Sequence, residues 1–391
     1  MQMGKRNKEQ IQFLKIKQEF AENFLKLLKT KLQNEPFLDR RIKVKHEGAY
    51  VLFPLINDVK KVNALIGGIS NQLNFDIVSA EGVVEENYKY RSIEEALVDE
   101  LPENILELVP RSYDIIGKIA IVEFDQINTI NNKNALHYKK KVAEALVSVN
   151  KSVETVYEKK SEVKGRYRLK ELKVIYGDDN PETIHKENDC FFKLDVKKAY
   201  FTPRLVFERK RVSSNNFKKQ EKIVDMFAGV GPFSIQIAKK NDVNIYAFDV
   251  NPSAYKYLVA NIELNNMKGD VIAHNIDVKK LLNPDDKLGN YLKHKIDRII
   301  MNLPEQSINF LDVACFLMKK PSGILHFYQF SEKPNPIKKV TENLSASLKN
   351  RGWHIEEILN SKVVKPFSPK SDLIVIDSKI KFLYNTYLND P

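Results

Sequence analysis

Cysteine is scarce in this sequence, which has two cysteines among its 391 residues. Cys190 and Cys315 lie far apart in the chain, and neither belongs to a Cys-x-x-Cys pair. The sequence therefore predicts neither a disulfide framework nor a zinc site. Such cysteine usage suits a reducing compartment, so we expect a cytoplasmic protein without a bound metal.

Long apolar runs are also missing from the chain. No run approaches the roughly 18 residues that a membrane-spanning helix needs. The first residues, Met-Gln-Met-Gly-Lys-Arg, lead into a polar amphipathic stretch and not into the apolar centre of a signal peptide. Internal repeats and long low-complexity tracts are absent as well. We therefore expect a globular protein that has no membrane partner.

Basic residues outnumber acidic ones by 63 to 51, which gives a formal net charge of +12. Such an excess attracts polyanions, and nucleic acids are the usual example. The excess is moderate and is spread along the chain, so it is equally consistent with a role in solubility. Charge alone therefore favours nucleic-acid binding without establishing it.

The length of the chain predicts two or three domains, because single hydrophobic cores rarely grow beyond about 250 to 300 residues. Residues 1–109 begin with an amphipathic pattern over residues 8–33, which predicts a helix that packs on a core. Its polar face mixes both charge signs, which disfavours a membrane-surface helix. Further elements predict a small α+β domain: strands at 50–56 and 75–78, and helices at 59–72 and 92–98.

Residues 110–212 predict a second, sheet-rich domain. An apolar run at 115–122 has the length of a strand and follows a turn-like segment. A helical pattern at 138–149 comes next, and strand patterns return at 169–176 and 191–196. A turn cluster at 177–181 separates these last two strands.

Residues 213–391 alternate apolar strands with amphipathic helices, which is typical of a parallel sheet covered by helices. The sequence therefore predicts an α/β fold here, a Rossmann-like domain with a doubly wound sheet. A polar segment at 213–220 is expected to be the linker into it. The expected strands are 223–227, 245–249, 271–275, 298–301, 324–328 and 373–376.

The segment at 223–234 predicts a binding site, because a buried strand runs into a glycine-rich turn and then into a helix. Glycine lets the backbone bend tightly and lets a ligand approach closely, and ligands of open α/β sheets collect at this edge. A dinucleotide fingerprint would have a third glycine where Ser234 stands, so it is incomplete here. The cofactor-binding residues expected in this segment are Asp225, Phe227, Gly229, Gly231, Pro232 and Phe233.

The next two strands also end in carboxylates. Asp249, followed by Val250, Asn251 and a proline, is placed to accept hydrogen bonds from both hydroxyls of a ribose. Asn251 is expected to cap the following helix, which leaves Asp249 free for a ligand. Asp277 follows the third strand and is expected near an adenine amino group, although an ordinary loop position remains the alternative.

The fourth strand ends in Asn302-Leu303-Pro304. This order of signals resembles the class I methyltransferases that use S-adenosylmethionine. An Asn-x-Pro segment after the fourth strand is typical of members that methylate nitrogen in bases or amides. The resemblance implies that Asn302 and Pro304 hold a planar target beside the cofactor, whereas a turn-forming role is the alternative for Asn302.

Three further segments narrow the resemblance: Gly165-Arg166-Tyr167-Arg168, the run from Tyr200 to Arg209, and Asp-Met-Phe-Ala-Gly-Val-Gly-Pro-Phe at 225–233. Together with Asp-x-Asn-Pro at 249–252 and Asn-Leu-Pro, they resemble the archaeal and eukaryotic tRNA guanine-37 N1-methyltransferase family over roughly residues 110–330. Residues 1–105 match only as an additional N-terminal domain. The resemblance implies S-adenosylmethionine as cofactor, tRNA as substrate and a monomeric enzyme.

The family's chemistry implies a role for several residues. The N1 of guanine carries a proton that must leave as the nitrogen attacks the methyl group, and by resemblance Glu208 accepts it, with a pKa raised by partial burial. Arg168 would stabilise the charge on the exocyclic oxygen and Tyr200 would position the base, although Arg166 competes with Arg168 for its role. Arg166, Arg204 and Arg209 are expected to bind RNA.

Three other functions remain open at this point. A wyosine-pathway enzyme that transfers an aminocarboxypropyl group would share the cofactor fold. A methyltransferase acting on small molecules or proteins would also share it, and so would a non-catalytic RNA-binding protein that retained the fold. Thr202 and Glu305 depart from the usual pattern of the family, and Glu305 leaves the details of the base pocket open.

Overall fold

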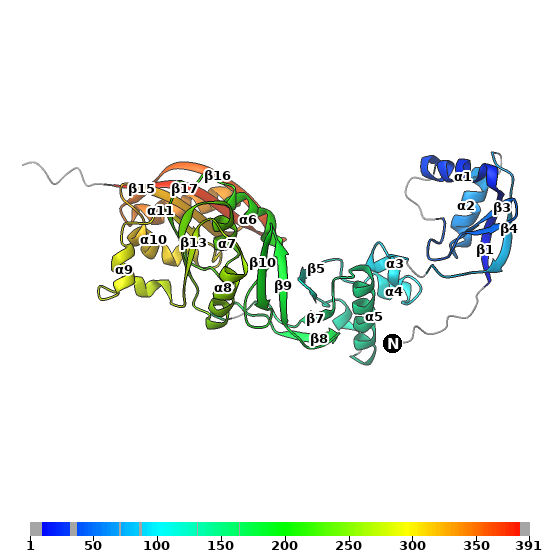
Figure 1. Cartoon of the computed structure of the whole chain (residues 1–391), viewed down its shortest axis with the longest axis horizontal. Coiled ribbons are helices and arrows are strands. Elements are labelled where there is room, and N and C mark those ends of the chain that lie inside the picture. Colours follow the sequence, from blue (N-terminus) through cyan, green and yellow to red (C-terminus); the bar gives the residue numbers. More distant parts are fainter. Residues whose placement is uncertain are drawn as a thin grey trace, which may run out of the picture. The chain divides into compact units, whose positions relative to one another are not determined.

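The computed structural model describes residues 10–31, 37–69, 72–85, 88–130, 132–163 and 165–383. The chain separates into two compact units, residues 1–91 and residues 92–391 (Figure 1). Within the described residues, no helix is long and apolar enough to cross a bilayer.

The first unit is a four-stranded antiparallel sheet with two helices, which confirms the expected α+β fold. The strands follow the order β2-β3-β1-β4. Leu14, Ile16, Phe24 and Phe53 form its core. The elements are β1 (Gln10–Lys17), α1 (Gln18–Lys31), β2 (Lys45–Glu47), β3 (Tyr50–Pro54), α2 (Val59–Ile69) and β4 (Phe75–Glu81).

The single helix expected over residues 8–33 is wrong in its first half, because Gln10–Lys17 is strand β1. This strand pairs with β3 on one side and β4 on the other, so its backbone is hydrogen-bonded along both edges. Phe13, Leu14 and Ile16 are all fully buried. Long-range strand pairing here outweighs the helical spacing of the apolar residues.

The second unit begins with α3 (Ile93–Leu97) and α4 (Glu103–Leu106), which pack in one apolar cluster with α5 (Asn132–Val149). The domain boundary expected at 109/110 therefore lies inside this unit. The run at 115–122 is a hairpin of two strands, since Gly117 turns the chain with a φ of +57°. A mixed sheet contains β5 (Tyr113–Ile116), β6 (Ile119–Val122), β7 (Thr155–Lys159) and β8 (Leu172–Tyr176).

A seven-stranded sheet forms most of the remainder and confirms the Rossmann-like class. Its order is β13-β12-β11-β14-β15-β17-β16, with five parallel strands and an antiparallel pair at one edge. The strands are β11 (Glu221–Asp225), β12 (Val243–Phe248), β13 (Asp270–His274), β14 (Arg298–Met301), β15 (Ser322–Glu332), β16 (Trp353–Ser368) and β17 (Ser371–Phe382). No strand was predicted from the sequence at the residues of β16.

Helices cover both faces of this sheet. Alternate residues along each strand enter opposite cores, so Ile223 faces α7 (Pro232–Lys240) and α8 (Pro252–Leu264), whereas Val224 faces α10 (Leu311–Leu317) and α11 (Pro336–Lys349). Further short helices of the second unit are η1 (Ile127–Thr129), η3 (Val278–Leu282), α9 (Lys287–Leu292) and η4 (Ser307–Phe310).

The strand order of the seven-stranded sheet reverses between β11 and β14. Open α/β sheets form a binding crevice at such a point.

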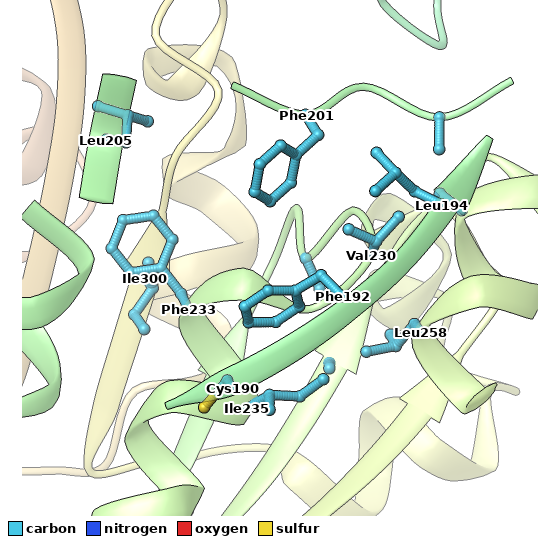
Figure 2. Packing of buried hydrophobic residues seen from close by; sticks show 14 of the residues in the cluster. Cys190, Phe192, Leu194, Phe201, Leu205, Val230, Phe233, Ile235, Leu258 and Ile300 are labelled. Atoms are coloured by element: carbon cyan, nitrogen blue, oxygen red, sulfur yellow. The ribbon is translucent and has the colours of Figure 1, made fainter. Parts of the chain in front are cut away.

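The hairpin of β9 (Glu182–Glu187) and β10 (Cys190–Asp195) packs on α7 and α8. Figure 2 shows Phe192 and Leu194 of β10 among Val230, Phe233 and Leu258, all in one buried cluster. This core crosses the boundary expected at 212/213. The hairpin leads through η2 (Pro203–Leu205) into α6 (Val206–Ser213), which brings residues 200–209 to the sheet.

Two asparagines of α8 join the hairpin to the sheet. The side-chain amide of Asn261 exchanges hydrogen bonds with the backbone N–H and carbonyl of Lys193, at 2.7 and 3.0 Å. Asn265 pairs in the same way with Phe191, at 2.9 and 2.8 Å. These amides satisfy backbone groups on β10 as a neighbouring strand would.

Candidate active site

One cavity of about 1010 Å³ opens at the carboxyl ends of the parallel strands, and residues 92–391 provide all of its walls. It brings together residues from three distant stretches of the chain. Among the predicted site residues, its lining includes Arg166, Arg168, Tyr200, Arg204, Arg209, Phe227, Gly229, Pro232, Phe233, Asp249, Val250, Asn251, Asp277, Asn302 and Pro304. Glu208, Asp225 and Gly231 are absent from that lining.

The glycine turn after β11 lies against the carboxylate that follows β12. Gly229 has a φ of +57° and donates its N–H to Asp249 Oδ2 at 2.7 Å. Asp249 Oδ1 accepts the N–H of Asn251 at 2.8 Å. Burial raises the pKa of Asp249, although these two backbone bonds oppose the shift. A Cβ atom at Gly229 would lie 3.7 Å from the carbonyl oxygen of Tyr200, an ordinary contact, so it is the positive φ that favours glycine here.

Gly231 has a φ of +91°, which confirms the expected tight bend of the backbone. A Cβ atom there would lie 2.6 Å from Leu258 and 2.9 Å from Ile235. The glycine therefore also lets α7 begin directly against α8. Its role in binding a cofactor stays a prediction.

Asp225 lies behind the turn and is 1% exposed. Its Oδ2 accepts a hydrogen bond from Ser234 at 2.7 Å, whereas Oδ1 has no partner among the described residues. Burial, together with the charge of Asp249, raises the pKa of Asp225 to about 7. Because Asp225 does not line the cavity, it supports the glycine turn from behind, and the carboxylate of Asp249, which does line the cavity, is the group that fits an adenosyl cofactor.

Asp277 and Arg166, predicted for different roles, form an ion pair of 2.6 Å at the rim. Asp277 also caps η3 by accepting the N–H of Lys279 at 3.0 Å. Asp277 therefore does have the ordinary loop role that was the alternative to binding adenine. Because Asp277 also lines the cavity, its carboxylate remains available to a ligand that displaces Arg166.

Arg168 lines the same cavity as the glycine turn. Its backbone has a φ of +57°, and its guanidinium lies 5.1 Å from the ring centroid of Tyr200. Nη2 lies 3.3 Å from Glu305 Oε1. Nε and Nη1 are buried and have no hydrogen-bond partner in the part of the chain that the structure describes. Such unsatisfied donors favour an incoming carbonyl or anionic oxygen.

Glu208 is 2% exposed and lies one side chain behind the cavity wall. Its carboxylate accepts the hydroxyl of Tyr328 at 2.7 Å and pairs with Arg211 at 2.6 Å and Lys362 at 2.8 Å. The ring of Tyr328 packs in turn on Phe233, which does line the cavity.

The expectation of a raised pKa at Glu208 is wrong. Burial of Glu208 acts to raise its pKa, but Arg211, Lys362 and Tyr328 outweigh burial, so the pKa is lowered. Arg211 is itself held by Asp377 at 2.6 Å. The sequence could not reveal these partners, because three of the four belong to β15, β16 and β17, more than a hundred residues away.

The structure also corrects the expectation that Arg209 binds RNA. Arg209 is 2% exposed and donates to both oxygens of Glu187, at 2.6 and 2.5 Å, and to the carbonyl of Thr202 at 2.9 Å. Nε and Nη2 of its guanidinium are therefore used in anchoring α6 to the β9–β10 hairpin. Arg204 is half exposed and pairs with Asp114 at 2.6 Å, which leaves it accessible.

Several lining residues were missed by sequence reasoning. They include Asp114 and Lys170 of the sheet-rich part, Phe330 of β15, and Lys365 and Phe367 of β16. No local motif marks these residues. Lys365 and Phe367 in particular depend on a strand that the sequence did not predict.

Comparison with known proteins identifies the family of this fold. The family model described as the TRM5/TYW2 methyltransferase domain matches residues 183–356, and that of the TYW2 N-terminal domain matches residues 93–180. The tRNA (guanine(37)-N(1))-methyltransferase Trm5b of Pyrococcus abyssi is 35% identical over 360 residues, covering 88% of this chain and 93% of the relative. The chain belongs to the TRM5/TYW2 methyltransferase family.

Solved structures of the TRM5/TYW2 family agree with this membership. The complex of aTrm5 with tRNALeu is 28% identical with a TM-score of 0.67, and the match covers 94% of this chain and 99% of that one. Pyrococcus horikoshii TYW2 in complex with MeSAdo is 28% identical with a TM-score of 0.59, covering 74% of this chain and 98% of that one.

Proposed function

We propose that this protein transfers a methyl group from S-adenosylmethionine to N1 of guanosine at position 37 of tRNA, as a cytoplasmic monomer. One observation supports this most directly: a single cavity joins the glycine turn and Asp249 to the unsatisfied donors of Arg168. Membership of the TRM5/TYW2 family supplies the reaction class, and the net charge of +12 suits an RNA substrate.

The proposal assigns the cofactor to the sheet side of the cavity. The backbone of Gly229 approaches it, Asp249 accepts the ribose hydroxyls, and Asp277 accepts the adenine amino group after parting from Arg166. Phe227, Val250, Pro232 and Phe233 line the apolar walls. S-adenosylmethionine supplies the methyl group on a positively charged sulfur.

The target base is assigned to the opposite side. Tyr200 offers a ring face, and Asn302 and Pro304 border the same space. Nε and Nη1 of Arg168 are the donors that would stabilise negative charge on the exocyclic oxygen of guanine. A nucleotide of the anticodon loop costs little to extrude, because it is not held in a duplex.

Glu208 is the proposed general base. In the structure its carboxylate faces Tyr328, Arg211 and Lys362 and not the cavity, so the proposal requires that it exchange these partners for the N1 proton when tRNA binds. Catalytic contacts commonly tighten only in the substrate complex. Its lowered pKa keeps the carboxylate ionised at neutral pH, and loss of the contacts with Arg211 and Lys362 would raise its basicity, because those contacts lower its pKa.

The three parts of the chain receive separate roles in this proposal. Residues 1–109 would recognise the tRNA body, and residues 110–212 would provide RNA contacts and catalytic groups, with Arg166 and Arg204 exchanging their carboxylates for phosphates. Residues 213–391 would bind the cofactor.

The test uses labelled S-adenosylmethionine and two tRNA transcripts that differ only at position 37. We expect the protein to methylate the transcript with guanosine and to leave the one with adenosine unlabelled. Equal labelling of the two transcripts would remove the assignment.

A second candidate is aminocarboxypropyl transfer to a modified guanosine. It is favoured by one observation, since residues 93–180 match a model named for TYW2. Mass spectrometry of the digested tRNA separates the two reactions, because the transferred groups differ in mass. We expect the added mass to be that of a methyl group.

A further inference from the structure

The cavity continues beyond the expected site, along strand β16. Lys365, Phe367 and Ser368 of β16 line the same cavity as Tyr200 and Gly229. The proposed methyl transfer assigns no role to this stretch of wall. Its chemistry is that of a positively charged and aromatic surface.

Three cations gather here around one carboxylate. Arg204 Nε lies 2.6 Å from Asp114 Oδ1, and Lys170 Nζ lies 3.9 Å from Asp114 Oδ2. Lys365 forms no ion pair with any carboxylate of the described residues. The cluster of Lys170, Arg204 and Lys365 therefore has more positive charge than Asp114 neutralises.

Burial makes this surplus charge costly. Burial, followed by the positive charge of Arg204, lowers the pKa of Lys365. The pKa of Lys170 is also lowered, first by burial and then by Lys159 and Arg204, against the attraction of Asp114. An anion that entered the cluster would relieve both effects.

An aromatic ring lies beside the cations. Phe367 is 57% exposed, which is unusual for a phenylalanine, and it lies on the cavity rim two residues after Lys365. Its ring packs on Phe330 with the centroids 4.1 Å apart and an interplanar angle of 32°. Phe330 therefore supports the ring, and more than half of the Phe367 surface remains open to a planar partner.

We propose that Lys170, Arg204 and Lys365 bind the phosphodiester of a nucleotide next to the target, and that Phe367 stacks on the base of that neighbour. A cluster of partly buried cations beside an exposed ring is the combination that binds single-stranded nucleic acids, with phosphate held by charge and a base held by its face. This inference rests on the proposed function, because the target nucleotide defines the neighbour.

The test measures RNA binding by the full-length protein with S-adenosylhomocysteine present, so that no turnover occurs. The probe is an anticodon stem-loop with guanosine 37 and with 2-aminopurine at position 36 or position 38. We expect Lys365→Ala to weaken binding and to reduce the slope of log K against log salt by about 1. Lys365→Arg should restore the slope.

Phe367→Ala should weaken binding roughly tenfold or more and abolish the quenching of 2-aminopurine at one of the two positions. Phe367→Tyr should retain both the wild-type affinity for RNA and the quenching of 2-aminopurine. Matched controls are Lys370→Ala, in the adjacent turn, and Leu359→Ala, an exposed apolar residue of the same strand. Both controls lie outside the cavity lining and should bind like the wild type.

A Lys365→Ala slope equal to that of Lys370→Ala would overturn the phosphate subsite. Quenching at neither position, with Phe367→Ala binding like Leu359→Ala, would overturn the stacking. Failure of the proposed function is a separate result, because it is read from the guanosine and adenosine transcripts and not from these binding curves.

Discussion

The Glu208 carboxylate has more donors around it than a catalytic base needs. Arg211, Lys362 and Tyr328 all contact it, and their combined effect exceeds that of burial. A base held in this way is ionised before its substrate arrives but must give up partners to accept a proton. Under the proposed mechanism, the energetic cost at Glu208 lies in exchanging these contacts and not in losing a proton beforehand.

Replacement of Glu208 by Gln should slow methyl transfer by roughly 100-fold or more, because the amide cannot accept the N1 proton. Single-turnover rates with saturating tRNA measure this, and cofactor affinity should stay near that of the wild type. Glu305→Gln is the matched control, since Glu305 lines the cavity and lies near Arg168. If Glu208→Gln methylates at the full rate and Glu305→Gln is inactive, the general base is Glu305 and not Glu208.

Asp225 leads to a prediction on stability. Because its pKa is raised to about 7 in the folded protein, folding retains a proton that the unfolded chain has lost. The free energy of unfolding should therefore fall as pH rises from about 4 to about 7, by on the order of 4 kcal/mol for this group.

Denaturant unfolding of the cofactor-free protein at several pH values measures this loss. Asp225→Asn should remove most of it, while Asp285→Asn, at an exposed position, should keep it. Parallel pH profiles for the wild type and Asp225→Asn would contradict the prediction.

Between elements, the amide pairs of Asn261 and Asn265 with β10 show what sequence patterns cannot reveal. The strands of the seven-stranded sheet other than β16 followed from apolar patterns in the sequence, and the glycine turn, Asp249 and Asn302 meet at the predicted edge because parallel strands end together. The partners of α8, by contrast, are backbone groups some seventy residues earlier. No local signal distinguishes such an asparagine from one that faces solvent.

Asn261→Ala should therefore destabilise the protein by roughly 3 kcal/mol, because it leaves the N–H and carbonyl of Lys193 and the carbonyl of Val230 without their partner. Urea unfolding followed by circular dichroism is the measurement. Asn290→Ala removes one exposed bond to Pro284 and serves as control, with an expected change below about 0.5 kcal/mol. Equal midpoints for the two variants would show that these amides are dispensable.

For the whole molecule, the division after Arg91 predicts that the second unit is an independent folding unit. A chain of residues 92–391 should fold, because clusters that contain no residue of the first unit form its cores. Calorimetry should show that this fragment binds S-adenosylhomocysteine with an affinity within about threefold of that of the full-length protein. The fragment should bind full-length tRNA more weakly than the full-length protein does. A fragment that does not fold, or that does not bind S-adenosylhomocysteine, would contradict this division.

The continuous core beneath the β9–β10 hairpin has a consequence for how the enzyme can grasp its substrate. Phe192 and Leu194 pack among residues of α7 and α8, so the hairpin that leads into residues 200–209 shares one core with the glycine turn. A rigid-body closure of these two parts over a nucleotide would have to break that core. We therefore expect the RNA backbone to deform more than the protein backbone does, so that selectivity depends on how readily an anticodon loop bends.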